Sequence, residues 1–392
     1  MRVAITGIGL VDTLGNSPES CFEEYMNGEY KSPEPYKGEG TYNQGRAGMY
    51  ADKWDLEIPD GIDPRMYKLL EHECKMGLHV IEQALGDRKR SQNVPVVFST
   101  ITAGGRLNYD YLMSTVDEFP QKKLNPFLQL QIVRDYFVGL VPQVYNLTGP
   151  TTSMHSACST GLYSLDYACR LVDEYDYVIC GSSDVGTYRG EMGFFGMVGA
   201  LSPTNNSSPF DKNRDGIVMG DGAACLILES EEKALARNAT IYGYVSGIGT
   251  GNDGNTGSAI APDVNMSGAK KAMSEAIKDV DKDCISWVNA HGTSTIVGDE
   301  LEYHAIQEVL GEIDVVSFKS KLGHTMGTSG LIETIYTLMA MRNNVIPPNY
   351  NIKELPEGVE VPMVAQDDVG MYALKNSFAF GGKNVSVLLQ GV

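Results

Sequence analysis

Long hydrophobic runs, metal-binding motifs and paired cysteines are missing from this sequence of 392 residues. Its apolar runs fall well short of the ~20 residues that a membrane helix needs, so we expect no membrane span. The N-terminal segment predicts a strand and a turn, which is too structured for a signal peptide. The histidines show no HExxH or other zinc-ligand spacing, so we expect no metal site.

Cysteine and positive charge are also scarce. The seven cysteines are scattered and never form a CxxC pair, which is typical of a reducing compartment and predicts a cytoplasmic protein. The 31 basic residues face 50 acidic ones, and the net charge of −19 argues against a nucleic-acid partner. Local basic groups remain at Arg65 with Lys68 and at Lys122 with Lys123; taken alone, they are typical of a solvated surface.

Strands that alternate with helices dominate the rest of the chain. Helical periodicity is found over 20–27, 65–86, 162–172, 267–278, 299–310 and 330–341. Short apolar runs predict strands at 3–5, 93–99, 177–180, 223–228, 240–248, 285–290, 315–320, 371–378 and 385–390. We expect the glycine-rich segment 190–199 to be a loop. The alternation predicts an α/β layered fold.

A short internal similarity suggests that this fold is built twice. The segments Ser159-Thr-Gly-Leu-Tyr-Ser-Leu-Asp-Tyr167 and Thr328-Ser-Gly-Leu-Ile-Glu-Thr-Ile-Tyr336 each place a small-residue turn before an apolar helix. Two similar α/β halves would account for this similarity. The charged connector 229–238 is the best boundary, giving an N-terminal half of residues 1–234 and a C-terminal half of residues 235–392.

One cysteine, Cys158, lies among small residues immediately before a predicted helix. A thiol at a helix N-terminus lies near unpaired N–H groups and the positive end of the helix dipole. We therefore expect a lowered pKa and a nucleophilic thiolate at Cys158. The alternative is a buried structural cysteine, which is the commoner role.

Two histidines lie where predicted strands give way to glycine-containing loops. His291 follows the strand at 285–290, and His324 follows the strand at 315–320. Because ligands bind at the carboxyl ends of strands in open α/β sheets, we expect both imidazoles to meet Cys158 in one site. Such a site suits acyl transfer, in which the sulfur attacks a carbonyl and imidazoles donate to a developing enolate.

Charged residues and a glycine-rich turn accompany these three side chains. Lys319, Glu333 and Asp299 are close to the histidine loops in sequence, and we expect a buried ionic network that orients the histidines. The turn Phe378-Ala-Phe-Gly-Gly-Lys-Asn384 allows close approach of backbone to a ligand. It lacks the GxGxxG and P-loop patterns, so nucleotide binding is not supported.

With these residues assembled, the chain resembles the β-ketoacyl-[acyl-carrier-protein] synthases, the elongating type II condensing enzymes of the thiolase superfamily. The motifs that carry the resemblance are Ser156-Ala-Cys-Ser-Thr-Gly161, Pro209-Phe-Asp211 with Arg214-Asp-Gly216, Gly220-Asp-Gly222, Asn289-Ala-His-Gly-Thr-Ser-Thr295, Lys319 with Gly323-His324, and Asn376-Ser-Phe-Ala-Phe-Gly-Gly382. The resemblance implies a thiolase-like five-layered αβαβα fold, a homodimer and no cofactor, since the substrates are carried on the phosphopantetheine arm of an acyl carrier protein.

The resemblance also implies roles for the residues that match the motifs. Cys158 would accept the acyl group, and His291 and His324 would promote decarboxylation of malonyl-carrier and condensation. Lys319 and Glu333 would be supporting charges.

Further roles concern the substrate and its carrier. Phe380 matches a gating aromatic whose backbone N–H completes the oxyanion hole with that of Cys158. Thr293 and Thr295 match contacts to the phosphopantetheine arm, and we place Ala103 and Phe378 beside the substrate. An acidic carrier would dock on a basic patch, for which the candidates are Arg65, Lys68, Lys122 and Lys123.

Two rival interpretations follow from related proteins. A chain-length-factor-type partner subunit of a ketosynthase heterodimer would lack the nucleophile, whereas this chain keeps Cys158 and both histidines. A thiolase would need a second catalytic cysteine near the C-terminus, and the last cysteine here is Cys284. The chain departs from the usual family pattern at Ala379, Lys383 and Ile296, where Gly, Thr and Pro are common.

Overall fold

The computed structural model describes residues 2–27, 30–37, 45–88, 92–105, 131, 133–254, 260–367 and 369–392. Strands of the first half are β1 (Val3–Asp12), β4 (Val96–Ser99), β5 (Thr151–Thr152), β6 (Val178–Val185) and β7 (Met219–Ser230). Strands of the second half are β8 (Gly243–Asn252), β9 (Ile285–Asn289), β10 (Asp314–Val316), β13 (Tyr372–Ala379) and β14 (Lys383–Gln390). Short strands are β2 (Glu34–Pro35), β3 (Ala47–Met49), β11 (Val345–Ile346) and β12 (Gln366–Asp367).

The ten strands assigned to the two halves follow one path, β10-β9-β13-β14-β8-β1-β7-β6-β4-β5. Read outward from the centre, the first half has the order β1-β7-β6-β4-β5 and the second half has the order β8-β14-β13-β9-β10. In both halves these strands are the first, fifth, fourth, second and third in chain order, and the pairing types match. In each half the first two pairings are antiparallel and the last two are parallel. The halves join where β1 pairs antiparallel with β8. The predicted architecture of two similar halves is confirmed.

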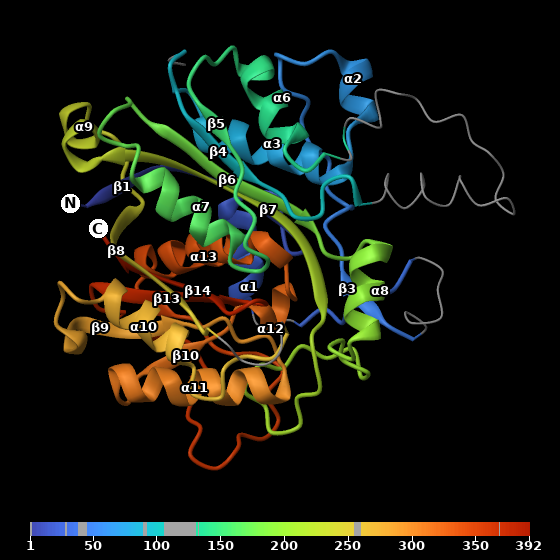
Figure 1. Cartoon of the computed structure of the whole chain (residues 1–392), viewed down its shortest axis with the longest axis vertical. Coiled ribbons are helices and arrows are strands. Elements are labelled where there is room, and N and C mark those ends of the chain that lie inside the picture. The colour runs from blue at the N-terminus through green and yellow to red at the C-terminus, as the bar shows by residue number, and fades with distance from the viewer. Residues whose placement is uncertain are drawn as a thin grey trace, which may run out of the picture.

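Helices cover both faces of each half and give five layers (Figure 1). The outer helices are α3 (His72–Leu85) and α6 (Tyr136–Tyr145) on the first half, and α10 (Ser267–Ala276) and α11 (Ile296–Leu310) on the second. The central layer contains α1 (Pro18–Met26), α7 (Thr160–Cys169) and α13 (Ser329–Arg342). The other helices within the described residues are α2 (Pro64–Leu69), α8 (Arg189–Met197), α9 (Glu231–Ala236), α12 (Lys319–Leu322) and the 3₁₀ turns η2 (Lys282–Cys284) and η3 (Met326–Thr328).

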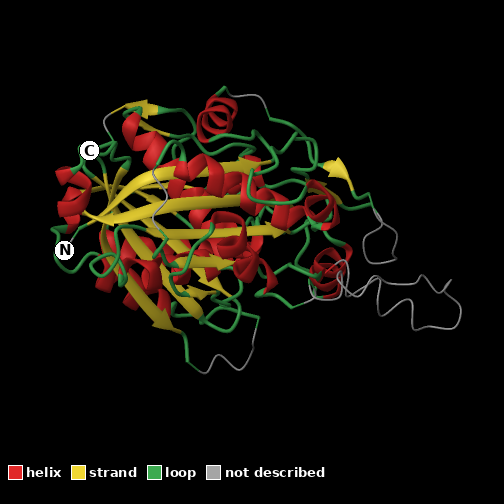
Figure 2. Ribbon diagram, turned by 90° about the horizontal axis from the view of Figure 1, so that it is seen from above, coloured by secondary structure: helices red, strands yellow, loops and turns green. Residues whose placement is uncertain are grey.

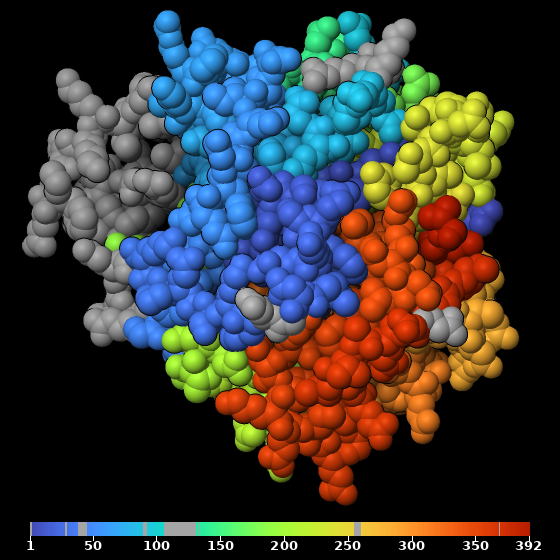
Figure 3. All heavy atoms as spheres, turned by 180° about the vertical axis from the view of Figure 1, so that it is seen from behind, coloured from blue at the N-terminus to red at the C-terminus, as the bar shows by residue number. Residues whose placement is uncertain are grey.

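Segments from opposite ends of the chain lie side by side. The two termini are close together at one side of the molecule, and helices flank the strands (Figure 2). On the back, the blue N-terminal segment borders the orange segment near residue 350 (Figure 3). There, Tyr25 of α1 donates a hydrogen bond of 3.1 Å to the carbonyl of Pro348. The N-terminal segment therefore packs against a C-terminal segment through α1 of the central layer.

α7 and α13, the two helices that contain the internally similar segments, pack against each other through glycines. A Cβ atom at Gly161 of α7 would lie 3.1 Å from Cγ of Leu331, and one at Gly330 of α13 would lie 2.7 Å from Cγ of Leu162. Gly161 and Gly330 are equivalent in the two copies, as are Leu162 and Leu331. The contact is thus reciprocal, and the N-terminal ends of α7 and α13 are brought together.

Three local predictions were wrong. The helix expected over 65–86 is two helices, α2 and α3, because Leu70 and Glu71 between them are extended. The segment 190–199 is not a loop, because α8 spans Arg189–Met197 and buries Met192 and Phe195 in a small cluster that outweighs its glycines. The strand expected at 315–320 ends at Val316. Beyond it, Ser317 donates its N–H to the Asn349 side chain at 2.8 Å and its hydroxyl to a loop carbonyl at 2.7 Å, which takes the chain out of the sheet.

Among the helices that the structure describes, none combines the length and apolar character needed to cross a bilayer.

The glycine contact between the halves generates a stability prediction. We expect Gly330→Ala to lower the free energy of unfolding by about 2 kcal/mol, because the added methyl group overlaps Leu162 in a closely packed layer. Gly190→Ala in α8 is the matched control, since a Cβ atom there meets nothing within 4 Å. Urea unfolding of both variants provides the measurement, and equal stabilities would contradict the packing argument.

Candidate active site

Cys158 lies in a tight turn directly before α7, and its side chain is buried. The preceding residue, Ala157, has a φ of 48°, a conformation that costs a non-glycine residue energy and is held here by surrounding contacts. The turn is bonded to both sides of the C-terminal hairpin. The Ser377 hydroxyl donates to the Cys158 carbonyl at 3.0 Å, and the Ser159 hydroxyl donates to the Lys383 carbonyl at 2.8 Å. These bonds fix the sulfur relative to β13 and β14.

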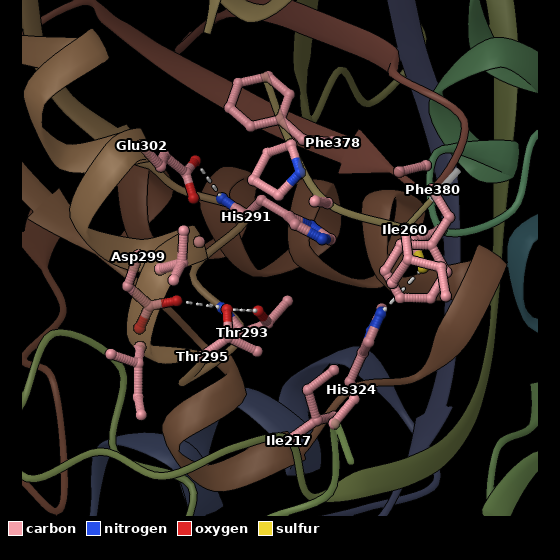
Figure 4. Close-up of a pocket in the computed structure, with 18 of the residues that line it drawn as sticks. Ile217, Ile260, His291, Thr293, Thr295, Asp299, Glu302, His324, Phe378 and Phe380 are labelled. Atoms are coloured by element: carbon pink, nitrogen blue, oxygen red, sulfur yellow. Dashed lines mark hydrogen bonds between the residues drawn. The ribbon is translucent and has the colours of Figure 1, made fainter. Parts of the chain in front are cut away.

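His324 contacts the sulfur directly. Its Nε2 lies 3.1 Å from Sγ of Cys158, and its Nδ1 lies 3.0 Å from the Ser329 hydroxyl (Figure 4). Its backbone is fixed by bonds to the beginning of β7, with the His324 N–H donating to the Val218 carbonyl at 2.7 Å. An imidazole that donates from Nδ1 to Ser329 leaves Nε2 free to accept the S–H proton.

His291 approaches from the end of β9. Its ring lies 5.5 Å from the His324 ring, nearly perpendicular to it at 85° (Figure 4). Glu302 of α11 holds the backbone, because its two carboxylate oxygens accept the N–H groups of His291 at 2.7 Å and Gly292 at 2.8 Å. Glu302 was not among the residues predicted from the sequence. The only signal was an acidic residue on the inner side of the predicted helix 299–310.

The predicted ionic network is present for Lys319 and Glu333 beneath His291, whereas Asp299, which was expected in it, bonds to other groups. The buried Lys319 ammonium donates to the His291 carbonyl and to Oε1 of Glu333, each at 2.6 Å. A second buried lysine, Lys375, bonds to Oε2 of the same glutamate. Lys375 was missed as well, although a lysine within the apolar strand run 371–378 was a usable signal.

Asp299 organises the neighbouring turn. Its buried carboxylate accepts the backbone N–H groups of Phe210 at 3.0 Å, Thr293 at 3.0 Å and Ser294 at 3.1 Å. The Thr293 and Thr295 hydroxyls are 3.1 Å apart (Figure 4). Asp299 therefore shapes the two-threonine wall of the site and does not contact the histidine rings.

The protonation states differ from the expected thiolate. Burial raises the pKa of Cys158 to about 12, and the nearby Lys319 charge only partly opposes this effect. Burial, together with the Lys319 charge, lowers the pKa of His291 and His324 well below the ordinary histidine value. The resting site thus holds a thiol and two neutral imidazoles, and His324 is placed to take the thiol proton when the sulfur attacks.

A cavity of about 450 Å³ connects these groups to the surface. The predicted site residues among its lining are Cys158, His291, Thr293, Thr295, His324, Phe378 and Phe380. Phe380 is stacked on Phe195 of α8, with ring centroids 5.8 Å apart. At the mouth, Ile296 and Val297 are 61% and 57% exposed, so the entrance is apolar.

Other predicted residues lie elsewhere. Ala103 is buried in the loop after β4 and is not part of this cavity lining. Arg65 and Lys68 are exposed on α2, away from the lining residues. Lys122 and Lys123 fall outside the described residues. Within the described ranges, no group of three or more His, Cys, Asp or Glu side chains could hold a metal ion.

The raised thiol pKa generates a prediction about reactivity. We expect alkylation of Cys158 by iodoacetamide to keep accelerating up to pH ~10, beyond the ~8.5 at which a free thiol titrates, because burial holds its proton. His324→Ala should slow the reaction at neutral pH by removing the proton acceptor. Mass spectrometry of the digest also follows the exposed Cys284 as a reference thiol. A Cys158 rate that levels off before that of Cys284 would contradict this assignment.

Comparisons with known proteins agree with this geometry. The family model described as "Beta-ketoacyl synthase, N-terminal domain" matches residues 1–234, and that described as "Beta-ketoacyl synthase, C-terminal domain" matches residues 242–353. The 3-oxoacyl-[acyl-carrier-protein] synthase 2 of Coxiella burnetii is 32% identical over 422 residues, covering 100% of this chain and 99% of its own. The protein of the same name from Vibrio cholerae is 31% identical, covering 99% of each chain.

Solved structures agree with these relatives. The ishigamide ketosynthase/chain length factor has a TM-score of 0.88 at 26% identity, covering 100% of this chain and 99% of that one. A β-ketoacyl synthase from Burkholderia phymatum has a TM-score of 0.86 at 25% identity with the same coverage. The chain therefore belongs to the β-ketoacyl synthase family.

Proposed function

We propose that this protein is a β-ketoacyl-[acyl-carrier-protein] synthase that elongates an acyl chain by decarboxylative condensation. The observation that carries the proposal is the grouping of one thiol and two neutral imidazoles around a single cavity. Sγ of Cys158 and Nε2 of His324 are 3.1 Å apart, and the two imidazole rings are 5.5 Å apart. A nucleophile with an adjacent base is the arrangement that acyl transfer requires.

In the first step, Cys158 takes the acyl group from an acyl-carrier thioester. The sulfur attacks the carbonyl carbon while its proton passes to Nε2 of His324; the bond from the carbonyl carbon to the carrier sulfur then breaks, and His324 returns the proton to the carrier thiolate as it leaves. The oxyanion is held by the backbone N–H groups of Cys158 and Phe380. Two hydrogen bonds from Ser377 and Ser159 tie the strands on either side of Phe380 to the Cys158 turn, so both donors belong to one rigid unit.

In the second step, malonyl-carrier loses carbon dioxide and its thioester becomes an enolate. For this step His324 takes its other tautomer, in which Nδ1 accepts from the Ser329 hydroxyl and Nε2 carries the hydrogen, so the neutral rings of His291 and His324 can each donate one N–H to the enolate oxygen. The enolate carbon attacks the acyl carbonyl on Cys158, the C–S bond breaks, and the Cys158 thiolate takes up one proton from solvent. Lys319 and Glu333 act through the His291 backbone and not as proton donors.

The apolar mouth and the two threonines suit the carrier's phosphopantetheine arm. Its amide groups would bond to the Thr293 and Thr295 hydroxyls, while its acyl cargo passes Phe378 and Phe380. An acyl carrier protein as partner, with Arg65, Lys68, Lys122 and Lys123 as docking charges, a homodimer and a cytoplasmic location complete the proposal. The seven free cysteines support that location.

A non-catalytic chain-length-factor-type role fits the site less well. Such a subunit needs neither a nucleophile nor a base, whereas here the thiol, its hydrogen-bonded imidazole and the second imidazole line one cavity. The acyl-transfer proposal uses all three groups.

Acyl loading tests the nucleophile. Incubation with acyl-carrier should raise the mass of the wild-type protein by one acyl group, and Cys158→Ala should show no increase because the accepting sulfur is gone. Cys169→Ala is the matched control, since that free cysteine lies at the other end of α7. Intact-protein mass spectrometry measures both, and an unmodified wild-type protein would count heavily against the proposed function.

The two histidines should separate by step. We expect His291→Ala to load acyl groups normally yet lose condensation by roughly 100-fold or more, because one of two donors to the enolate is missing. His324→Ala should slow both steps, since this ring also contacts the sulfur. Single-turnover loading and product formation, measured separately, provide the test. Equal effects of His291→Ala on loading and condensation would refute the division of roles.

A further inference from the structure

The ammonium group of Lys375 lies in a buried cage of oxygen atoms that the mechanism above leaves unassigned. We propose that Lys375 is a built-in monovalent cation: a positioning residue whose ammonium occupies a cation site beneath His291 and fixes that histidine for condensation. Lys375 belongs to β13, where its side chain is fully buried.

The geometry of the cage resembles ion coordination more than ordinary lysine pairing. Nζ of Lys375 contacts Oε2 of Glu333, the Asn376 carbonyl at 2.6 Å, the Ala290 carbonyl at 3.3 Å and Oδ1 of Asn289 at 3.4 Å. An ammonium has three N–H groups, so four oxygens exceed its directed bonds. Carboxylate, amide and carbonyl oxygens arranged around one charge are what a dehydrated potassium ion also requires.

The cage is preformed, because other contacts orient its ligands. The Asn289 side-chain amide donates to the Glu333 carbonyl at 3.0 Å and to the Thr337 hydroxyl at 2.8 Å, which turns its oxygen toward Nζ. Two other cage oxygens are backbone carbonyls: that of Ala290 directly follows β9, and that of Asn376 lies within β13. Removal of the lysine side chain would therefore leave the oxygen ligands in place but remove the positive charge that they surround.

The position of the cage connects it to catalysis. Lys375 contacts the carbonyl of Ala290, and Lys319 contacts the carbonyl of the next residue, His291. The two lysines meet on opposite oxygens of Glu333. Consecutive carbonyls at the end of β9 are thus held by two cations joined through one carboxylate, which fixes the peptide that carries the His291 ring.

The same positive charge favours the protonation state that the reaction needs. The Lys319 and Lys375 charges both contribute to lowering the pKa of His291, after burial. A neutral His291 keeps one ring N–H group, which can donate to the enolate oxygen. Loss of the charge at 375 should weaken condensation through the position of the His291 backbone.

Replacement of Lys375 tests whether a free ion can substitute for the ammonium. Lys375→Ala leaves the cage open, Lys375→Met fills the space without a charge, and Lys321→Ala removes another buried lysine that contacts Glu24 and Tyr25 instead. Each protein is measured in potassium chloride and in tetramethylammonium chloride at equal ionic strength. The second cation is too large for the cage.

The first readout is thermal stability, which does not depend on the proposed function. We expect potassium to raise the melting temperature of Lys375→Ala by about 3 °C relative to tetramethylammonium, because a bound ion stabilises the folded state. Wild type, Lys375→Met and Lys321→Ala should show no such difference. The proposal would be overturned if folded Lys375→Ala had the same melting temperature in potassium and in tetramethylammonium. It would also be overturned if this variant failed to fold in potassium buffer.

The second readout rests on the proposed function. In tetramethylammonium, condensation by Lys375→Ala should fall roughly 100-fold while acyl loading changes by less than about 3-fold, since the effect acts through His291. Potassium should recover at least about 10-fold of the condensation rate in Lys375→Ala and none in Lys375→Met. Full condensation activity of Lys375→Ala without potassium would refute the positioning role. A wild-type protein that neither loads nor condenses would refute the proposed function and leave the melting comparison as the test of the cage.

Discussion

The reciprocal contact of α7 with α13 is the constraint on which the arrangement of this protein depends. Gly161 faces Leu331 and Gly330 faces Leu162, so the two halves meet through equivalent residues of a repeated motif. A side chain at either glycine would separate the helices. Because both helices begin at this contact, the turn that carries Cys158 and the loop that carries His324 lie next to each other, and a sulfur–imidazole contact of 3.1 Å results.

Burial in this central layer decides the chemistry of the site. A thiol and two imidazoles in a water-poor interior favour their neutral forms, so the raised pKa of Cys158 and the lowered pKa of both histidines have one cause. The positive end of α7 and the charge of Lys319 do not outweigh it. An enzyme of this kind activates its nucleophile by proton transfer to a neighbour during attack, and a stored thiolate is not required.

The charged groups buried in the same interior are paired with opposite charges or bonded to backbone N–H groups. Glu333 is shared by Lys319 and Lys375, Glu302 accepts two backbone N–H groups, and Asp299 accepts three. Each carboxylate is bonded within the protein, to lysines or to backbone N–H groups, and Asp299 and Glu302 also form part of the cavity lining. The rest of the wall consists mainly of apolar side chains, two threonines and the three reacting groups, which suits a thioester substrate.

The motifs around Cys158, His291 and His324 were sufficient to predict the family, the α/β class and the three residues that meet at the cavity. The similarity of Ser159–Tyr167 to Thr328–Tyr336 was sufficient to predict two halves, because a glycine contact that is used twice leaves the same residues in both copies. Local composition failed at α8, whose glycines suggested a loop, since the burial of Met192 and Phe195 is a tertiary effect.

The remaining features were decided by packing. No sequence pattern announces that Glu302 holds the His291 backbone or that Lys375 reaches Glu333, because these partners come from separate elements and meet only in the folded chain. The pKa of Cys158 was mispredicted for the same reason. The position of the thiol before a helix could be read from the sequence, but the depth of its burial, which raises the pKa, could not. Sequence alone determined which groups react, and tertiary structure determined their protonation and the charges that hold them, because burial and long-range contacts arise only when the two halves close on each other.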